Sequence, residues 1–391
     1  MNQQTYASEM RHPEGVIQVH AAQVGAKEAE AVARVIATRN LVMGKEVAAF
    51  EEEFAAFTGA KYAVALNSGT SALHAALLAC NICPGDEVLV PAITFFATVE
   101  AVLYVGGIPR FTDINERACM GIEQFTDAIQ RWPKAKAAIP VHYGGHPADV
   151  VEITKQCRLR GMVCIEDAAM AHGALVSRDS LHVGTIGDAG CFSFYATKYC
   201  TTGEGGMLIT DNEAIAKDVR LRRVHGMIDR STHITLGYNW RMSEIEAAIG
   251  RVQLEGLEER VARQTFHTEL IYGGLSGCDW LQKLPRRFDD CPCYWFADVL
   301  LDPDINPQRF MAHLMREGIE PRYRYSEPLY MQPVMLDFYA AHGEAGVVDL
   351  YHSRCQRSLR YSSHLVGLPN RPDMTCRERA RVISAVRGFA V

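Results

Sequence analysis

Helical patterns alternate with short β-branched runs from about residue 26 to residue 260, and this alternation limits the folds that the chain can adopt. It predicts an α/β fold with a mostly parallel sheet sandwiched by helices, because parallel strands need crossovers that cover both faces. The predicted strands are 62–66, 87–90, 108–112, 137–141, 162–166, 189–194 and 206–210. The predicted helices lie near 70–80, 94–105, 122–131, 147–160 and 212–224, and glycines at 106 and 161 are placed to end two of them.

The chain has 391 residues, more than one small core usually takes, so we expect a large domain with a smaller one attached. Ser243 and Glu246 form a capping-box pattern that opens a long amphipathic segment ending near Arg263. We expect this segment to carry the chain out of the large domain. The expected division is a large domain of residues 1–255 and a small C-terminal α+β domain of residues 256–391. In the small domain the pattern predicts a strand at 294–301, a helix at 307–317 and a last helix opened by Thr375.

Charge and composition argue against several classes of protein. The formal net charge of −6 disfavours a general nucleic-acid binder, because such proteins concentrate positive charge against phosphates. No apolar run approaches the roughly 20 residues of a membrane-spanning helix, and the first residues lack the pattern of a signal peptide. We therefore expect a cytoplasmic protein without membrane contact. Twelve irregularly spaced cysteines fit reduced thiols, and the one Cys-x-x-Cys, at 80–83, has no second pair, so we expect no metal site.

Lys198 and Asp167 form the most informative pair of side chains. Lys198 follows strand-forming residues and precedes a glycine-rich segment at 203–206, and Asp167 ends an acidic strand 31 residues earlier. A lysine amine can form an imine with an aldehyde cofactor, and a carboxylate can keep a pyridine nitrogen protonated so that the ring accepts electrons. The pair suggests a pyridoxal phosphate enzyme. Each residue also has a plainer interpretation when it is taken singly. Lys198 would more often be a solvated lysine, and Asp167 is as readily a helix cap or a salt-bridge partner as a cofactor ligand.

Two further segments fit that cofactor. Residues 67–73, Asn-Ser-Gly-Thr-Ser-Ala-Leu, follow an apolar strand and open a helix, where free backbone N–H groups and the helix dipole favour a phosphate. The same residues also suit plain helix capping, and they lack the Gly-Lys-Ser/Thr of a nucleoside-triphosphate loop. Phe95 begins the helix after strand 87–90, so its ring is a candidate to stack on the pyridine, although a double phenylalanine is usually core.

Together these segments make the chain resemble the fold-type I pyridoxal phosphate enzymes of the DegT and StrS sugar-aminotransferase family. The resemblance covers nearly the whole length. The matching segments are NSGTSALHAAL, PGDEVLVPAITFFAT, PVHYGGHPADV, IEDAAMAHGA, GDAGCFSFYATK, TTGEGGMLIT and GYNWRMSEIEAAIGRVQLE. The resemblance implies a transaminase of amino-sugar and polysaccharide biosynthesis with pyridoxal 5'-phosphate as its cofactor.

The resemblance also implies a role for each matching residue. Lys198 would form the imine and then shuttle a proton, Asp167 would pair with the pyridine nitrogen, and Phe95 would stack on the ring. The phosphate would be held by Gly69, Thr70 and Ser193 and, from a neighbouring subunit, by Asn239. The protein would then be a homodimer with active sites shared between its subunits.

Two positions depart from the family pattern. Met170 stands where the family usually carries Gln or His near the phenolic oxygen of the cofactor, and a thioether is a poor hydrogen-bond donor there. Tyr330 stands where the family often has His in a Pro-Leu-His segment. For this reason the resemblance assigns no substrate contacts in the small domain.

The implied reaction has two halves. An amino acid, by resemblance L-glutamate, gives its nitrogen to the cofactor, and the ketone of a sugar, by resemblance nucleotide-linked, then accepts it. Lys198 argues against the dehydratases of the same fold, in which the lysine position resembles histidine. A cyclic ketone of the inosose type without a nucleotide, and a non-catalytic sensor that only binds a ligand, remain alternatives.

A sugar diphosphate would need local cations in a chain of net charge −6. One candidate cluster lies on a predicted helix and the residues after it, and a second lies in the small domain. They are Arg220, Arg222, Arg223 and His225, and Arg322 with Arg324. A solvated basic helix face accounts for the first cluster equally well.

Overall fold

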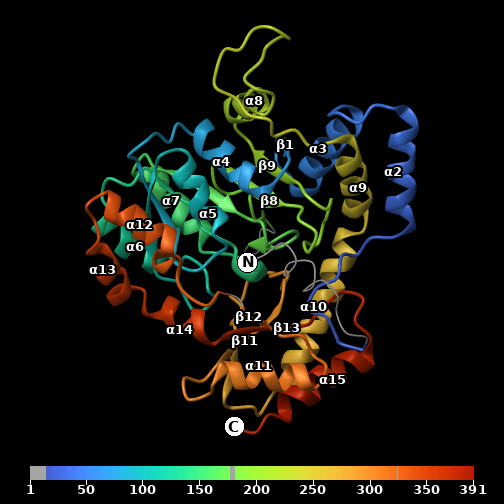
Figure 1. Ribbon diagram of the computed structural model, residues 1–391, viewed down its shortest axis with the longest axis vertical. Helices are drawn as coiled ribbons and strands as arrows, with labels where there is room; N and C mark the ends of the chain where they lie inside the picture. Colours follow the sequence, from blue (N-terminus) through green and yellow to red (C-terminus); the bar gives the residue numbers. More distant parts are fainter. Residues whose placement is uncertain (1–14, 177–180, 324) are drawn as a thin grey trace.

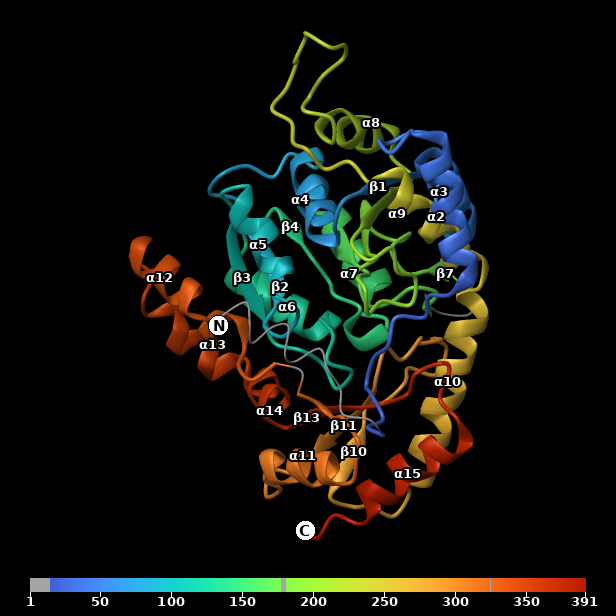
Figure 2. The ribbon, with the colours of Figure 1, turned by 45° about the vertical axis from the view of Figure 1, so that its right-hand side comes forward.

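The computed structural model describes residues 15–176, 181–323 and 325–391 (Figure 1). It contains a seven-stranded sheet, a four-stranded sheet and a two-stranded sheet. Figures 1 and 2 both show the helix α10 (Leu257–Gly274) running from the end of the molecule that holds the large sheet to the end that holds the four-stranded sheet. The chain thus forms two layered units joined along one long helix.

The large sheet is mostly parallel, as the sequence predicts. Its strand order is β1-β9-β8-β5-β4-β2-β3, and β9 is antiparallel to both of its neighbours while the other pairings are parallel. The strands are β1 (Tyr62–Leu66), β2 (Glu87–Pro91), β3 (Ile108–Thr112), β4 (Ala137–Ala138), β5 (Val163–Asp167), β8 (Ala189–Ser193) and β9 (Gly206–Thr210). The carboxyl ends of the six parallel strands therefore meet at one edge of the sheet.

One predicted strand is shorter than expected. The sequence predicts a strand over 137–141, but regular pairing of β4 ends at Ala138, and only an isolated bridge between Val141 and Asp167 continues it. Pro140 explains the difference, because proline has no backbone N–H to donate to the ladder. The chain leaves the regular sheet at this point but stays beside the end of β5.

Helices cover both faces of the large sheet, so alternate residues of one strand enter different cores. Val64 and Leu66 of β1 pack into the core beneath one set of helices, and Ala63 and Ala65 pack into the other. The first face carries α4 (Gly69–Ala79), α5 (Ala97–Tyr104) and α8 (Glu213–Arg222). The second carries α3 (Lys45–Thr58), α6 (Ile122–Arg131), α7 (Val150–Leu159) and α9 (Glu244–Glu255). The sandwich predicted from the sequence is confirmed.

The segment that follows Ser243 is two helices instead of one. The capping box of Ser243 and Glu246 opens α9 as predicted, but α9 ends at Glu255 and α10 begins at Leu257. Gly256 lies between them, and a side chain on Gly256 would meet the guanidinium of Arg260, 2.7 Å from the position of its Cβ. Glycine is also a poor helix former, so the break falls there, and the helical path continues past the predicted end at Arg263.

The small sheet is antiparallel throughout and has helices against it, as an α+β unit does. Its strands are β10 (Leu281–Lys283), β11 (Ala297–Leu301), β13 (Leu365–Leu368) and β12 (Arg322–Tyr323), and its helices are α11 (Pro307–Arg316) and α15 (Cys376–Arg387). The predicted capping box of Thr375 opens α15. The predicted strand at 294–301 begins only at Ala297, because Tyr294 has a positive φ of 50° that a regular strand does not allow.

Later segments return to the large sheet. Tyr351 packs on Phe111 with ring centroids 5.4 Å apart, and Arg110 of β3 pairs with Glu344. Tyr351 lies in α13 (Val347–Arg354), and Glu344 lies between α12 (Pro333–Ala341) and α13. The remaining elements are α2 (Ala26–Thr38), η1 (Tyr143–Gly145), β6 (Leu175–Val176), β7 (Leu181–His182), η2 (Leu329–Met331) and α14 (Gln356–His364). The division of the chain after residue 255 stays a prediction.

Two findings bear on the chemistry of the chain. All twelve cysteines lie within the described residues and none of them forms a disulfide. Among the described residues there is no helix of sufficient length and apolarity to cross a membrane.

Candidate active site

The carboxyl edge of the large sheet brings the sequence-predicted residues together. Leu66 at the end of β1 and Ser193 at the end of β8 both lie opposite Gly206 at the start of β9. As a result Gly69 approaches Ser193 so closely that a Cβ added to Gly69 would lie 2.7 Å from the Cβ of Ser193. The first turn of α4 and the end of β8 therefore form one continuous surface.

The turn before α4 is built as a helix N-terminus. The Ser68 hydroxyl accepts a hydrogen bond from the backbone N–H of Ser71 at 3.0 Å, and the Ser71 hydroxyl donates to Asn67 at 2.8 Å. These serines cap the helix, so the capping interpretation holds for them. The first N–H groups of any helix have no partner inside it, and here they belong to Gly69, which is buried, and Thr70, which is half-buried.

Asp167 is buried at the end of β5, with 5% of its surface exposed. Its Oδ2 accepts a hydrogen bond from the Thr98 hydroxyl at 2.8 Å, and its Oδ1 accepts one from the backbone N–H of Ala169 at 3.1 Å. Burial raises the pKa of the Asp167 carboxyl, and these two hydrogen bonds and then the charge of Lys198 oppose that rise. The joint role of Lys198 and Asp167 at one cofactor stays a prediction.

Lys198 is half-buried where distant parts of the chain converge. Its Nζ lies 3.9 Å from the centroid of the Trp295 ring, and the indole N–H of Trp295 donates to the carbonyl of Thr197 at 3.2 Å. The Trp295 ring in turn stacks on His20 with centroids 5.1 Å apart. A small cavity of about 20 Å³ lies beside the lysine, and its lining includes residues 19–21, Gln23, Arg260, Gln264 and Arg371.

Two other predicted residues differ in exposure. Phe95 lies just before α5 and is 62% exposed, so its ring is open to a ligand or to another subunit. Met170 is buried, and its carbonyl accepts a hydrogen bond from the thiol of Cys293 at 3.6 Å. Stacking of Phe95 on a pyridine and the place of Met170 beside a phenolic oxygen stay predictions.

Asn239 reaches the same edge from the segment between α8 and α9. Its carbonyl accepts a hydrogen bond from the side-chain amide of Asn67 at 3.4 Å, and the carbonyl of Trp240 accepts one from the backbone N–H of Asn67 at 2.9 Å. The Asn239 side chain is exposed. Figures 1 and 2 show that the loop preceding it projects away from the body of the chain. Which subunit's site the Asn239 side chain completes stays a prediction.

Three residues that the sequence did not single out belong to this edge. Thr98 and Trp295 contact Asp167 and Lys198 as described above. His172 is fully buried, with its ring centroid 5.4 Å from that of Phe192. Burial and then the charge of Lys198 lower the pKa of His172 to about 3, so its ring is neutral at neutral pH.

Glu166, the neighbour of Asp167, has a different environment. Its carboxylate accepts three backbone N–H groups, from Gly184 at 2.7 Å, Ile186 at 2.7 Å and Gly187 at 2.6 Å. His142 Nε2 lies 2.9 Å from the same carboxylate. Because His142 Nδ1 accepts the N–H of Ala148, its Nε2 carries the proton and donates to the carboxylate. Glu166 is fully engaged in holding the loop that follows β7.

Three arginines of the first basic cluster have partners within the fold, and the role of the cluster as a diphosphate clamp stays a prediction. Arg223 binds the Glu51 carboxylate and the carbonyl of Ala65. Arg220 donates to a carbonyl of β1 at 3.1 Å, and Arg222 binds Asp218 on its own helix at 2.6 Å. Arg220 and Arg223 thus tie the end of α8 to β1, an edge strand whose carbonyls need donors.

The other positions that the sequence singled out beyond residue 255 are Tyr330, Arg322 and Arg324. Tyr330 is fully buried and packs on Phe111 and Tyr351, with ring centroids 6.0 Å and 5.5 Å apart, so it is a core residue. In the second basic pair, Arg322 is exposed on β12, and Arg324 lies outside the described residues.

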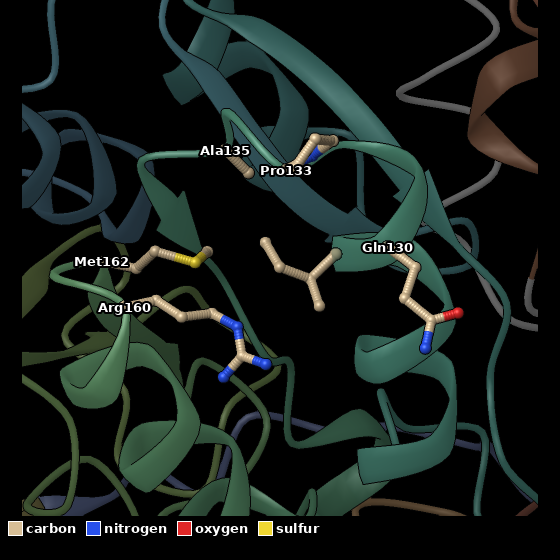
Figure 3. Close-up of a pocket in the computed structure, with 6 residues that line it drawn as sticks. Gln130, Pro133, Ala135, Arg160 and Met162 are labelled. Carbon is tan, nitrogen blue, oxygen red and sulfur yellow. The ribbon is translucent and has the colours of Figure 1, made fainter.

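A larger hollow lies elsewhere and has no part in this site. Figure 3 shows it between Gln130, Pro133 and Ala135 on one side and Arg160 and Met162 on the other. Its volume is about 340 Å³. Ala135 and Met162 come just before β4 and β5, so the hollow lies at the amino ends of these strands, opposite the edge that gathers Asp167.

The model of the DegT/DnrJ/EryC1/StrS aminotransferase family matches residues 22–387. The chain belongs to this family. It is 38% identical over 382 residues to the spore coat polysaccharide biosynthesis protein SpsC of Bacillus subtilis (strain 168), covering 93% of this chain and 94% of the relative. It is 33% identical over 302 residues to the GDP-perosamine synthase of Escherichia coli O157:H7, covering 76% of this chain and 81% of the relative.

A solved structure supports the same assignment. The crystal structure of S. venezuelae DesV in complex with a ketimine intermediate is similar with a TM-score of 0.83 and 30% sequence identity, covering 92% of this chain and 93% of DesV. The members of the family are PLP-dependent aminotransferases, and this chain is one of them. The expected family, fold class and enzyme class are confirmed.

Proposed function

We propose that this aminotransferase holds PLP at the carboxyl edge of its large sheet and moves an amino group from L-glutamate to the ketone of a nucleotide-linked sugar. The observation that carries the proposal is the meeting, at that edge, of buried Asp167 at the end of β5 with the end of β8, which leads to Lys198, and with the N-terminal turn of α4. An amine and a carboxylate that face one site can hold the aldehyde and the pyridine nitrogen of one ring.

The residues at the edge fit the cofactor. Asp167 receives two hydrogen bonds from the protein, whereas an ionised carboxylate can accept about four, so it can also accept a pyridinium N–H. The positive charge of that group would offset the burial that raises the pKa of Asp167. The close approach of Gly69 to Ser193 brings the N-terminal turn of α4 beside the end of β8, where its backbone N–H groups could bind a phosphate group.

When bound, PLP supplies an aldehyde and an electron-accepting ring. Lys198 Nζ would hold the aldehyde and, as a free amine, would move a proton at the substrate carbon. Trp295 offers the face of its ring to that amine and is held in place by its own bond to the carbonyl of Thr197. Asp167 would pair with the pyridine nitrogen, and the first turn of α4 would hold the phosphate with Gly69, Thr70 and Ser193.

The names of two relatives support an amino-sugar product. One relative is a GDP-perosamine synthase and another belongs to spore coat polysaccharide biosynthesis. These names favour a nucleotide-linked keto sugar over a free cyclic ketone. Because three arginines of the first basic cluster already have partners in the fold, exposed Arg322 is a further candidate cation for the nucleotide.

We further propose that the enzyme is a homodimer in which Asn239 contacts the phosphate in the neighbouring subunit. The loop before Asn239 projects from the body of the chain and exposes Ile228, Ile234 and Leu236, the last with 74% of its surface. Apolar side chains gathered on a projecting loop are typical of a protein interface. Burying them against a second subunit would bring Asn239 to that subunit's site.

The test is a pair of half-reactions followed by absorption spectroscopy. L-Glutamate added to the PLP-loaded enzyme should convert the aldehyde spectrum to that of pyridoxamine phosphate. The pyridoxamine form is then offered a GDP-linked keto sugar, a UDP-linked keto sugar or an inosose. Restoration of the aldehyde spectrum by a nucleotide-linked sugar alone supports the proposal, and restoration by the inosose alone rejects it.

A further inference from the structure

We infer that Thr98 is a positioning residue that fixes and orients the Asp167 carboxylate for the pyridine nitrogen. The inference rests on the proposed function, since it concerns the same cofactor site. It adds a residue that neither the sequence pattern nor the family resemblance assigns.

Thr98 and Asp167 come from different elements. Thr98 lies in the first turn of α5, and Asp167 is the last residue of β5, 69 positions further along the chain. The Thr98 side chain is fully buried, and its hydroxyl donates to Asp167 Oδ2 at 2.8 Å. This hydrogen bond therefore ties the start of α5 to the end of β5 within the protein interior.

The hydroxyl of Thr94 extends this hydrogen bond into a chain of three side chains. Thr94 Oγ1 lies 3.2 Å from Thr98 Oγ1. An ionised carboxylate only accepts, so the Thr98 hydrogen must point to Asp167, and Thr94 must then donate to Thr98. The three side chains form a chain of hydrogen bonds that ends on one carboxylate oxygen, and such chains strengthen each bond in a low-dielectric interior.

The same turn also places the predicted stacking ring. The backbone N–H of Thr98 donates to the carbonyl of Phe95 at 3.2 Å. One helical turn therefore sets both the start of α5, where Phe95 lies, and the donor to Asp167. A shift of this turn would move the ring and the carboxylate together.

Asp167 keeps a defined pattern of free acceptor sites because Thr98 and Ala169 take one oxygen each. With both oxygens fixed, the carboxylate cannot rotate without losing a bond. A buried carboxylate that lost the Thr98 donor would take up a proton more readily, and a neutral acid is a poorer partner for a pyridinium. We therefore expect Thr98 to act on cofactor affinity through Asp167.

The experiment compares cofactor dissociation constants, measured by absorption titration of the apoenzyme with PLP. Thr98→Val removes the hydroxyl and keeps the shape, so the dissociation constant should rise roughly tenfold or more, as for a lost hydrogen bond to a charged group. Thr98→Ser keeps the hydroxyl and should stay within roughly threefold of wild type. Thr154→Val is the matched control, because Thr154 is also buried and its hydroxyl bonds Cys164 of the same strand at 3.3 Å, away from the site. It should bind PLP as wild type does.

A double-mutant cycle separates positioning from a general structural effect. If Thr98 acts through Asp167, Thr98→Val should change affinity little once Asp167→Asn is present. Thermal unfolding of each apo protein reports folding, and Thr98→Ala replaces Thr98→Val should the valine variant not fold. Equal affinity of wild type and Thr98→Val, or an undiminished effect of Thr98→Val beside Asp167→Asn, would overturn the inference. A wild-type chain that does not bind PLP overturns the proposed function itself, and the inference with it.

Discussion

Glu166 and Asp167 are consecutive residues at the end of β5 and have opposite surroundings. Glu166 is held by three backbone N–H groups and by His142, whereas Asp167 receives two donors and lies beside the charge of Lys198. Successive residues of a strand face opposite sides of the sheet, which explains the difference. Glu166 fixes a loop, and Asp167 keeps acceptor capacity for the proposed pyridinium.

Asp167→Asn should stabilise the cofactor-free chain relative to wild type at neutral pH. Burial raises the pKa of Asp167 above 3.8, so the folded chain binds this proton more tightly than the unfolded chain. Wild-type stability therefore falls as the pH rises from about 3.8 through the raised pKa, by up to about 1.4 kcal/mol per pH unit from this group. Urea unfolding of both apo proteins over that range measures the difference, which should grow with pH.

Glu166→Gln is the matched control for that variant. In this variant the amide nitrogen of the glutamine would face backbone N–H groups that bind a carboxylate oxygen in wild type. We therefore expect a loss of roughly 3 kcal/mol in the free energy of unfolding. If Asp167→Asn loses as much stability as Glu166→Gln across the pH range, Asp167 is a structural carboxylate and its assignment to the cofactor is wrong.

Gly69→Ala should weaken PLP binding and destabilise the fold. The new methyl group would lie 2.7 Å from the Cβ of Ser193, so the first turn of α4 must move away from β8. We expect a cost of roughly 1 to 3 kcal/mol, as for overpacking in a core, and a higher dissociation constant for PLP. Gly273→Ala serves as the control, because nothing lies within 4 Å of its Cβ position inside α10. That change should stabilise the chain by up to about 1 kcal/mol without affecting PLP.

His172→Phe should reduce the loss of stability in acid. The pKa of His172 is about 3 in the folded chain, against 6.5 when unperturbed, because of burial and then the charge of Lys198. The unfolded chain therefore gains a proton first as the pH falls below about 6.5, and wild type loses up to about 1.4 kcal/mol per pH unit from this group. Denaturant unfolding at several pH values compares the slopes. Parallel slopes for the two proteins would show that the ring does not titrate as described.

Asn239→Ala and Lys198→Ala should complement each other if the sites are shared. Each variant alone should be inactive or nearly so. Random pairing after mixing gives about half mixed dimers, and each would carry one intact site, so about a quarter of wild-type activity should return. Recovery of activity is measured after unfolding and refolding the mixture. No recovery, with dimers formed, would place Asn239 in the site of its own subunit.

The sequence predicts the large sheet well because its strands are buried on both faces and read as apolar runs. The runs at 62–66 and 206–210 match β1 and β9 without change. Parallel strands end at a common edge, so the meeting of Gly69, Asp167 and Ser193 could also be predicted. The failures are local: Pro140 shortens β4, and Gly256 divides the helix that follows Ser243.

The contacts of the site could not be predicted, because their partners are distant in sequence. Thr98 meets Asp167 from 69 positions away, and Trp295 meets Lys198 from beyond the large sheet. No local pattern marks a threonine in a first helical turn or a tryptophan before a strand as part of a site. For the same reason the sequence could not show that Arg223 is engaged by Glu51.

The most direct test of the account is reductive trapping of the cofactor. Wild-type protein loaded with PLP is treated with borohydride, which makes an imine permanent, and the modified peptide is identified by mass spectrometry. One pyridoxyl group should appear on Lys198 and none in Lys198→Ala, which should remain folded and colourless. A label on another lysine, or a wild-type chain that retains no PLP, would rule out the proposed role of Lys198.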